Sequence, residues 1–325
     1  MMDRLPATET PDVVVGIREM DDAGVYRVSD GLSLVQTVDF FYPPLNDPAG
    51  CGRVVAANCL SDVWAMGARP IAAMNILAYP AGRIPPEAIE AMLAGACEKL
   101  REAGVALLGG HTLEQEELVY GLSVTGLASA DGLFRNEGAR PGDLLILTKP
   151  IGTGVYCNAL QKDTLTPAQY EAFAGSMERL NMYAADALRG SHPHCVTDVT
   201  GFGLLGHALP MARGSGLVFR FEASKVPLLP DALEMLREFS SKGVCKCRDL
   251  VDPHLEIGKH VDERYVTAFS ESQTSGGLLA AVDPGIAQDA LRAVRHAGDQ
   301  SAEIVGSVVE RPPGLSDEVY LEIEP

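Results

Sequence analysis

The chain has 325 residues, of which 46% are hydrophobic, 22% charged and 6% aromatic, proportions that exclude a disordered or collagen-like protein. At about 100–200 residues per domain, this length predicts two domains, each able to bury its own core. The 26 Lys and Arg against 44 Asp and Glu give a net charge of −18, which argues against binding nucleic acid phosphates or an anionic membrane surface.

Strand-like and helix-like segments alternate through the first half of the chain. A short β-branched segment at 32–38 predicts a strand with Asp39 at its C-terminal end. A helix is expected over 52–66, closed by Gly67 as its C-cap. The further predicted elements are a strand at 71–77, a helix at 85–103, a strand at 105–108 that runs into Gly109-Gly110, and a strand at 118–127.

The strongest turn cluster in the middle of the chain is 136–143, which predicts a domain boundary there. We expect an N-terminal domain at 1–138 and a C-terminal domain at 139–325. In the second domain, helices are predicted near 166–189, 203–214, 229–239 and 286–297, and strands near 144–148, 195–197, 217–221 and 278–282. The alternation predicts an α/β fold in both halves.

The sequence has no apolar run of the ~18–20 residues that span a bilayer, and its start lacks the apolar stretch of a secretory signal, so we expect a cytoplasmic protein. The seven scattered cysteines form no C-x-x-C pair and are expected to be reduced and mostly packed. Cys245 and Cys247, the one close pair, are expected to be an exposed incidental pair rather than a metal or redox site.

Acidic residues are the candidates for chemistry, because an acidic protein can handle phosphates through magnesium ions bridged by carboxylates. Asp62 lies on a helix amid apolar neighbours, with Asn58 one turn earlier on the same face, which favours a carboxylate aimed at a metal over a polar stripe facing water. Asp22, Asp39 and Asp198 are weaker candidates. For Asp39 and Asp198, a turn or an N-cap is the structural alternative.

Glycine pairs supply a second kind of candidate. Gly109-Gly110-His111-Thr112 follows an apolar strand, where two glycines let backbone N–H groups approach a phosphate, although a plain turn is the commoner role. Gly152-Thr153-Gly154 and Gly201-Phe202-Gly203 each open a predicted helix, whose N-terminus favours anions. The sequence has no G-x-x-x-x-G-K-[ST] and no histidine pair at zinc-ligand spacing, so His111 and His207 are expected to be exposed or hydrogen-bonded.

Taken in order, these segments resemble one family, selenophosphate synthetase (selenide, water dikinase), over nearly the whole chain. The motifs that carry the resemblance are D-D-A-G-V-Y at 21–26, T-V-D-F-F at 37–41, N-C-L-S-D-V-W-A-M-G at 58–67, G-G-H-T at 109–112 and T-D-V-T-G-F-G at 197–203, with T-K-P-I-G-T-G at 148–154 and Q-T-S-G-G-L-L at 273–279 extending it. The wider superfamily includes aminoimidazole ribonucleotide synthetase, thiamine-monophosphate kinase and the hydrogenase maturation ATPase.

The resemblance implies ATP-dependent phosphorylation of selenide to selenophosphate, with AMP and orthophosphate as the other products. It implies Mg²⁺ ligands at Asp22, Asp39, Asp62 and Asp198, and nucleotide contacts at Asp39, Asn58, Gly109, Gly110 and Thr112. It also implies two α/β domains of the aminoimidazole ribonucleotide synthetase type and a homodimer with a β-barrel between the subunits.

The chain departs from this family in one respect. The family carries an N-terminal glycine-rich segment with a Cys or selenocysteine followed three residues later by a Lys, and residues 1–19 contain neither a cysteine nor a lysine. We expect a truncated sequence, with a protein that naturally lacks the segment as the alternative. This chain is then expected to bind ATP and Mg²⁺ but to turn over selenide weakly or not at all. A nucleotide-binding regulatory protein and an enzyme of purine or thiamine metabolism are the alternative functions.

Overall fold

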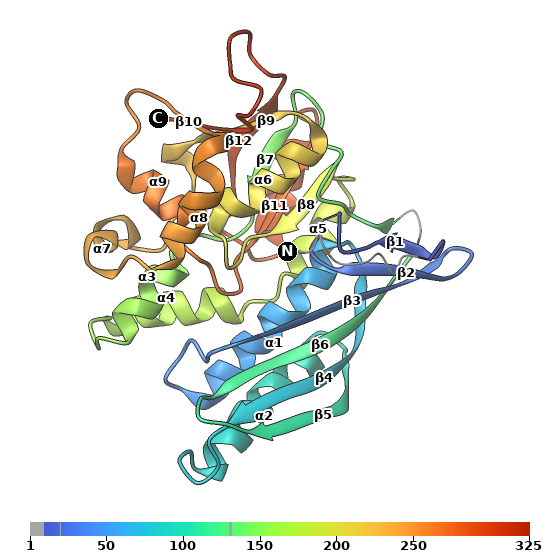
Figure 1. Ribbon diagram of the computed structural model, residues 1–325, viewed down its shortest axis with the longest axis vertical. Helices are drawn as coiled ribbons and strands as arrows, with labels where there is room; N and C mark the ends of the chain where they lie inside the picture. Colours follow the sequence, from blue (N-terminus) through green and yellow to red (C-terminus); the bar gives the residue numbers. More distant parts are fainter. Residues whose placement is uncertain (1–9, 20, 130–131) are drawn as a thin grey trace. The chain divides into compact units, whose positions relative to one another are not determined.

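The computed structural model describes residues 10–19, 21–129 and 132–325 and divides into two compact units (Figure 1). Unit 1 comprises Met1–Phe134 and Glu178–Met182, and unit 2 comprises Arg135–Met177 and Tyr183–Pro325. Each unit contains one β-sheet with helices packed against it. No helix in the described part of the chain is both long and apolar enough to cross a membrane.

Unit 1 is built on a six-stranded sheet in the order β1-β2-β3-β6-β4-β5. All neighbouring strands pair antiparallel except β4 and β5, which are parallel. The strands are β1 (Val13–Val15), β2 (Gly24–Ser29), β3 (Leu32–Phe41), β4 (Arg69–Tyr79), β5 (Ala106–Glu114) and β6 (Val119–Ala128).

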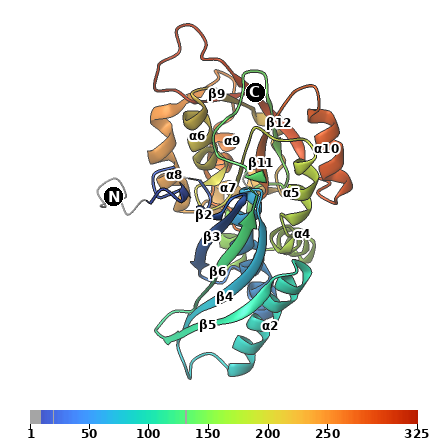
Figure 2. The ribbon, with the colours of Figure 1, turned by 90° about the vertical axis from the view of Figure 1, so that its right-hand side faces the viewer.

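Two helices, α1 (Pro48–Ala65) and α2 (Pro86–Glu102), lie on one face of this sheet (Figure 2). The Asp47 side chain caps α1 by accepting a hydrogen bond from the Gly50 N–H at 2.7 Å, and Pro48 occupies the first turn, where its missing N–H costs nothing. The helix ends ahead of Gly67, which has a φ of +68°. Because α1 packs on β3, β6 and α2, it is apolar around most of its circumference.

The opposite face of the unit 1 sheet carries exposed apolar side chains. In β3, Val35 is buried, whereas Val38 and Phe40 are more than half exposed. Every residue of the edge strand β5 is exposed. This sheet is therefore covered by helices on one side only.

Unit 2 contains a seven-stranded mixed sheet in the order β10-β13-β9-β12-β7-β11-β8. Its strands are β7 (Leu144–Leu147), β8 (Cys195–Asp198), β9 (Val218–Glu222), β10 (Leu255–Ile257), β11 (Leu278–Val282), β12 (Glu303–Val309) and β13 (Leu321–Glu324). Its helices are α3 (Thr153–Leu160), α4 (Pro167–Glu178), α5 (Met182–Arg189), α6 (Gly203–Ser215), α7 (Ala232–Phe239), α8 (Gly243–Val251), α9 (Glu263–Ser270) and α10 (Ala287–His296). All five residues of β11 are buried.

Several predicted elements are confirmed, including the helix at α2 and the strands at β6 and β11. Three predictions are wrong in detail. Asp39 lies inside β3, because the strand continues through Phe41 opposite Tyr120. Gly109 and Gly110 lie within β5 rather than in a turn after it. The helix expected over 166–189 is broken at 179–181, where the chain contributes to unit 1.

Candidate active site

The carboxylates of Asp39 and Asp62 lie at the interface between β3 and α1. Thr37 and Asp39 are two residues apart on β3 and therefore share the face that packs on α1. Asn58 and Asp62 are one helical turn apart on α1 and face the strand. The Asn58 amide donates a hydrogen bond to Asp39 Oδ2, and the Thr37 hydroxyl donates one to Asp62 Oδ2. The structure thus brings three of the predicted site residues together, and adds Thr37, which the sequence did not single out.

Burial shapes the electrostatics of this cluster. It raises the pKa of Asp39, an effect that the Asn58 hydrogen bond opposes. Cys59 lies beside them, with its Sγ donating to the Asp39 carbonyl oxygen at 3.2 Å. Burial, with the Asp39 and Asp62 charges, raises the pKa of this thiol well above its usual range, so it stays protonated. The cluster therefore offers oxygen donors and no thiolate.

A divalent oxygen-seeking cation fits this donor set. No Lys or Arg in the described residues forms an ion pair with Asp39, so a cation would supply the charge that favours its ionised form. Carboxylate oxygens suit Mg²⁺. The alternative of a turn or an N-cap at Asp39 is excluded by its position inside the strand.

Asp22 precedes β2, the neighbour of β3. Gly24 pairs with Gln36 in antiparallel register. Asp22 itself lies in a bend two residues before this paired stretch. Asp22 thus leads into β2, the strand that pairs with β3.

The glycine motif lies farther from these carboxylates. Asp39 pairs with Leu122, Leu122 with Asn75, and Asn75 with Gly110, so Asp39 and Gly110 occupy one row across four strands. Three strand spacings amount to roughly 14 Å. Thr112, two residues after Gly110, lies on the same exposed edge strand. Within one chain, the glycine motif and the aspartate cluster thus do not touch.

A segment far along the sequence supports α1. The Glu178 carboxylate forms an ion pair with Arg53 Nε at 2.9 Å, and the Asn181 amide donates to Ser61 Oγ at 2.8 Å. Ser61 is buried directly beside Asp62. This contact fixes the helix at the turn that carries Asp62, and no sequence signal indicates it because the partners are 120 residues apart.

In unit 2, Asp198 is the last residue of β8 and is buried. The N-cap of α6 is Phe202, so Asp198 does not cap that helix. A carboxylate oxygen of Asp198 lies within 4.8 Å of a ring nitrogen of His207. Burial lowers the pKa of His207 to about 4, so its ring is neutral at pH 7.

The neutral ring of His207 accepts two hydrogen bonds on Nε2. The Thr200 hydroxyl lies at 3.1 Å and the Phe202 N–H at 3.4 Å. Because Nε2 accepts, the proton is on Nδ1. His207 therefore braces the turn that follows Asp198, and the expectation of a hydrogen-bonded histidine agrees with this placement.

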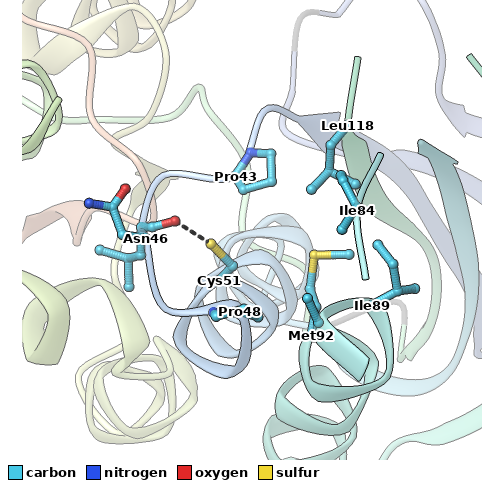
Figure 3. Close-up of a pocket in the computed structure, with 10 residues that line it drawn as sticks. Pro43, Asn46, Pro48, Cys51, Ile84, Ile89, Met92 and Leu118 are labelled. Atoms are coloured by element: carbon cyan, nitrogen blue, oxygen red, sulfur yellow. Dashed lines mark hydrogen bonds between the residues drawn. The ribbon is translucent and has the colours of Figure 1, made fainter. Parts of the chain in front are cut away.

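An apolar pocket of about 120 Å³ lies in unit 1, at the first turns of α1 and α2 (Figure 3). Its lining comprises Pro43, Leu45, Asn46, Pro48, Cys51, Ile84, Ala88, Ile89, Met92 and Leu118. Cys51 Sγ donates to the Leu45 carbonyl at 2.8 Å, and burial raises its pKa to about 11. With Asn46 as the single amide in an otherwise apolar lining, this pocket does not suit a triphosphate.

The comparisons with known proteins place the chain in a class. The family model described as AIR synthase related protein, N-terminal domain, matches residues 20–128, and the model of the C-terminal domain matches 140–316. A thiamine-monophosphate kinase from Stenotrophomonas maltophilia has the same fold, with a TM-score of 0.69 and 20% identity over 97% of this chain and 92% of that one. The hydrogenase maturation protein HypE in complex with ATP gives a TM-score of 0.67 at 20% identity, over 90% of this chain and 80% of that one. The chain is an AIR synthase related protein with the two-domain fold of that class.

Closer relatives narrow the class further. The selenide, water dikinase of Pelobacter propionicus is 42% identical over 303 residues, which cover 93% of this chain and 87% of the relative. That of Geobacter metallireducens is 43% identical over 306 residues, covering 94% and 88%. The chain belongs to the selenide, water dikinase family, which confirms the resemblance seen in its motifs.

Proposed function

We propose that this protein makes selenophosphate, converting ATP, selenide and water to selenophosphate, AMP and orthophosphate. The observation that carries the proposal is the identity of more than 40% with selenide, water dikinases over more than nine tenths of the chain. The half-buried oxygen-donor cluster of Asp39, Asn58 and Asp62 lies within the motifs that the resemblance rests on.

The aspartates are assigned to metal binding. Asp22, Asp39, Asp62 and Asp198 would hold Mg²⁺, which supplies neutralisation of the triphosphate charge when bound. Asn58 donates its amide to Asp39, and we assign it a contact with a phosphate oxygen as well. Partial burial of Asp39 lowers the solvation of its carboxylate, which strengthens a charge interaction made there.

Nucleotide contacts are further assigned to Asp39, Gly109, Gly110 and Thr112. The roughly 14 Å between Asp39 and Gly110 along the sheet leads us to propose that two copies of the chain cooperate, each offering its exposed β5 and the apolar face around Phe40. The proposed homodimer closes a β-barrel from the two unit 1 sheets, which would cover those side chains.

The function is tested by following nucleotide products from ATP and Mg²⁺ with and without selenide. Selenide-dependent AMP and orthophosphate are expected, slowly at most from this chain and faster from a chain extended by the family's N-terminal segment. In the extended chain, Asp39→Asn should lower their rate by at least about 100-fold because the cation loses a ligand. The matched control is Asp289→Asn, which changes an exposed aspartate on α10 paired with Arg292. ADP as the product would instead indicate a kinase of the purine or thiamine type, and nucleotide binding without turnover in the extended chain as well would indicate a regulatory protein.

The same assay is run on a chain extended at its N-terminus by the family's Cys-Lys segment. The prediction from the sequence is that residues 1–19 supply neither group and that the extended chain is faster. Residues 1–9 lie outside the described part of the structure, so this stays a prediction. Equal selenide-dependent rates for the two chains would contradict it.

A further inference from the structure

Gln273 caps a helix from a distant part of the chain. Its side chain is buried, and its Oε1 accepts three hydrogen bonds, from Gly152 N–H at 2.8 Å, Thr153 N–H at 3.0 Å and the Thr153 hydroxyl at 3.1 Å. These donors form the start of α3, which the sequence predicted as an anion site. The amide oxygen already satisfies them, so that prediction is wrong for these N–H groups.

The same residue also holds the turn that follows Asp198. The Gln273 backbone N–H donates to the Thr200 carbonyl at 2.8 Å, and the hydroxyl of the preceding Ser272 donates to the Gly201 carbonyl at 2.7 Å. The Gln273 Nε2 donates to the Glu271 carbonyl at 2.8 Å, which fixes the side chain at its other end. The Gln273 side chain therefore connects the start of α3 to segment 272–273, which hydrogen-bonds to the carbonyl groups of residues 200–201.

Backbone pairing extends this contact to Asp198 itself. Asp198 pairs with Leu278 in the sheet, and the Val199 N–H donates to the Gly277 carbonyl at 2.9 Å. A Cβ at Gly276 would lie 2.0 Å from the Val199 carbonyl oxygen, so only glycine permits this approach. The segment 272–278 thus lies against 198–201 along its whole length.

We propose that Gln273 is a positioning residue for Asp198. By anchoring segment 272–278 to the start of α3, it fixes the direction in which the Asp198 carboxylate points, and Ser272 adds a second, weaker hold. The proposal rests on the metal role given above to Asp198. A role limited to capping α3 is the competing explanation.

The test is Mn²⁺ binding, followed by electron paramagnetic resonance of the free ion, on the intact protein. Gln273→Met keeps the length of the side chain and removes its amide. We expect its Mn²⁺ affinity to fall about tenfold, since loss of a group that orients a metal ligand costs about 10–100-fold. Ser272→Ala should lower the affinity in the same direction by about threefold. Gln300→Met, at an exposed glutamine whose amide donates to the Arg295 carbonyl, is the matched control and should bind as the wild type does.

Wild-type Mn²⁺ affinity in Gln273→Met, with only a lower melting temperature, would overturn the proposal in favour of simple capping. If Gln273→Met does not fold, Ser272→Ala decides, and unchanged affinity there overturns it as well. Unchanged affinity in Asp198→Asn would remove the metal role and the proposal together. The protein could also make no AMP from selenide. Lower Mn²⁺ affinity in Gln273→Met and Ser272→Ala would then still support the positioning role, and only the proposed reaction would be overturned.

Discussion

The sheets of the two units differ in how completely their surfaces are covered. In unit 2, the inner strands β7 and β11 are apolar and buried almost throughout, and the edge strand β8 is buried as well. In unit 1, helices cover one face, and β3 and β5 expose apolar side chains on the other. Of the exposed large apolar side chains in the described residues, eleven belong to unit 1 and three to unit 2.

The difference shows that the two sheets bury their apolar surface in different ways. A sheet with a buried strand such as β11 completes its core within one unit. An apolar face with an exposed edge strand is a place where another chain can add. The contrast supports the proposal that unit 1 carries the surface between two copies and that unit 2 does not.

Phe40→Asp is expected to have the largest effect on this comparison. Phe40 is 56% exposed in one chain, so the variant should fold as a monomer, but a pair would bury the new charge in each subunit. We expect the dimer dissociation constant to rise by at least about 1000-fold, or ~4 kcal/mol, measured by sedimentation equilibrium. Ile286→Asp, at an exposed apolar residue of unit 2, should sediment as the wild type does. A dimeric Phe40→Asp protein would show that this face is not the interface.

The second prediction compares the loss of stability from truncating a buried side chain of the unit 2 sheet with that from truncating an exposed one of the unit 1 sheet. Leu279 in β11 is fully buried, so Leu279→Ala should lower the free energy of unfolding by about 2–5 kcal/mol through lost burial and a cavity. Leu108→Ala in β5 removes a side chain that is 67% exposed in one chain, and should cost within about 0.5 kcal/mol in the monomeric Phe40→Asp background. Denaturant unfolding checks both. Equal costs would mean that the unit 1 face is covered within a single chain.

The sequence predicted the covered parts of the molecule better than the uncovered ones. The continuous apolar run of β11 and the amphipathic pattern of α2 each match one kind of element, and both were predicted within a residue or two. In β3 the outward positions Val38 and Phe40 are as apolar as the inward ones, so the alternation that marks a half-covered strand is absent. The predicted strand therefore ends at residue 38 with Asp39 at its C-terminal end, whereas β3 continues to Phe41.

The candidate site shows the same division between local and distant information. Asn58 and Asp62 were paired correctly on one helix face because a spacing of four is a local signal. Thr37 was missed because its partner Asp62 is 25 residues away. The role of Gln273 depends on donors about 120 residues distant, and no local pattern indicates such a contact.

The pH dependence of the unfolding free energy tests how well the helices of unit 1 shield the Cys51 thiol from water. Burial raises the pKa of Cys51 to about 11 from an ordinary value of 9.0. The unfolded chain loses this proton near pH 9 while the folded chain keeps it, so the stabilisation is complete below pH 9 and is lost as the pH rises towards 11. Two pKa units correspond to up to about 2.7 kcal/mol.

Cys51→Ala removes this pH-dependent stabilisation. The advantage of the wild type over the variant in unfolding free energy should therefore shrink by up to about 2.7 kcal/mol from pH 9 to 11. Urea unfolding at a series of pH values measures it. Ile89→Val, in the same pocket, changes packing without a titrating group and should give a constant difference. A constant difference for Cys51→Ala too would mean that water reaches the thiol.

The smallest expected effect comes from replacing one glycine in each unit by alanine, which distinguishes backbone strain from a contact with the nucleotide. Gly109 in β5 and Gly142 ahead of β7 have φ values of +134° and +93°, and a Cβ at either would meet no atom within 4 Å. Alanine at each position should therefore cost about 1–2 kcal/mol of unfolding free energy through backbone strain alone. If the Gly109 N–H faces a phosphate, Gly109→Ala should in addition weaken ATP binding by about tenfold, whereas Gly142→Ala should leave it unchanged. Isothermal titration with ATP and Mg²⁺ measures this difference. Equal ATP affinities in the two variants would reduce the glycine pair of β5 to a conformational role, and the uncovered edge of unit 1 would then serve association without contributing to the nucleotide site.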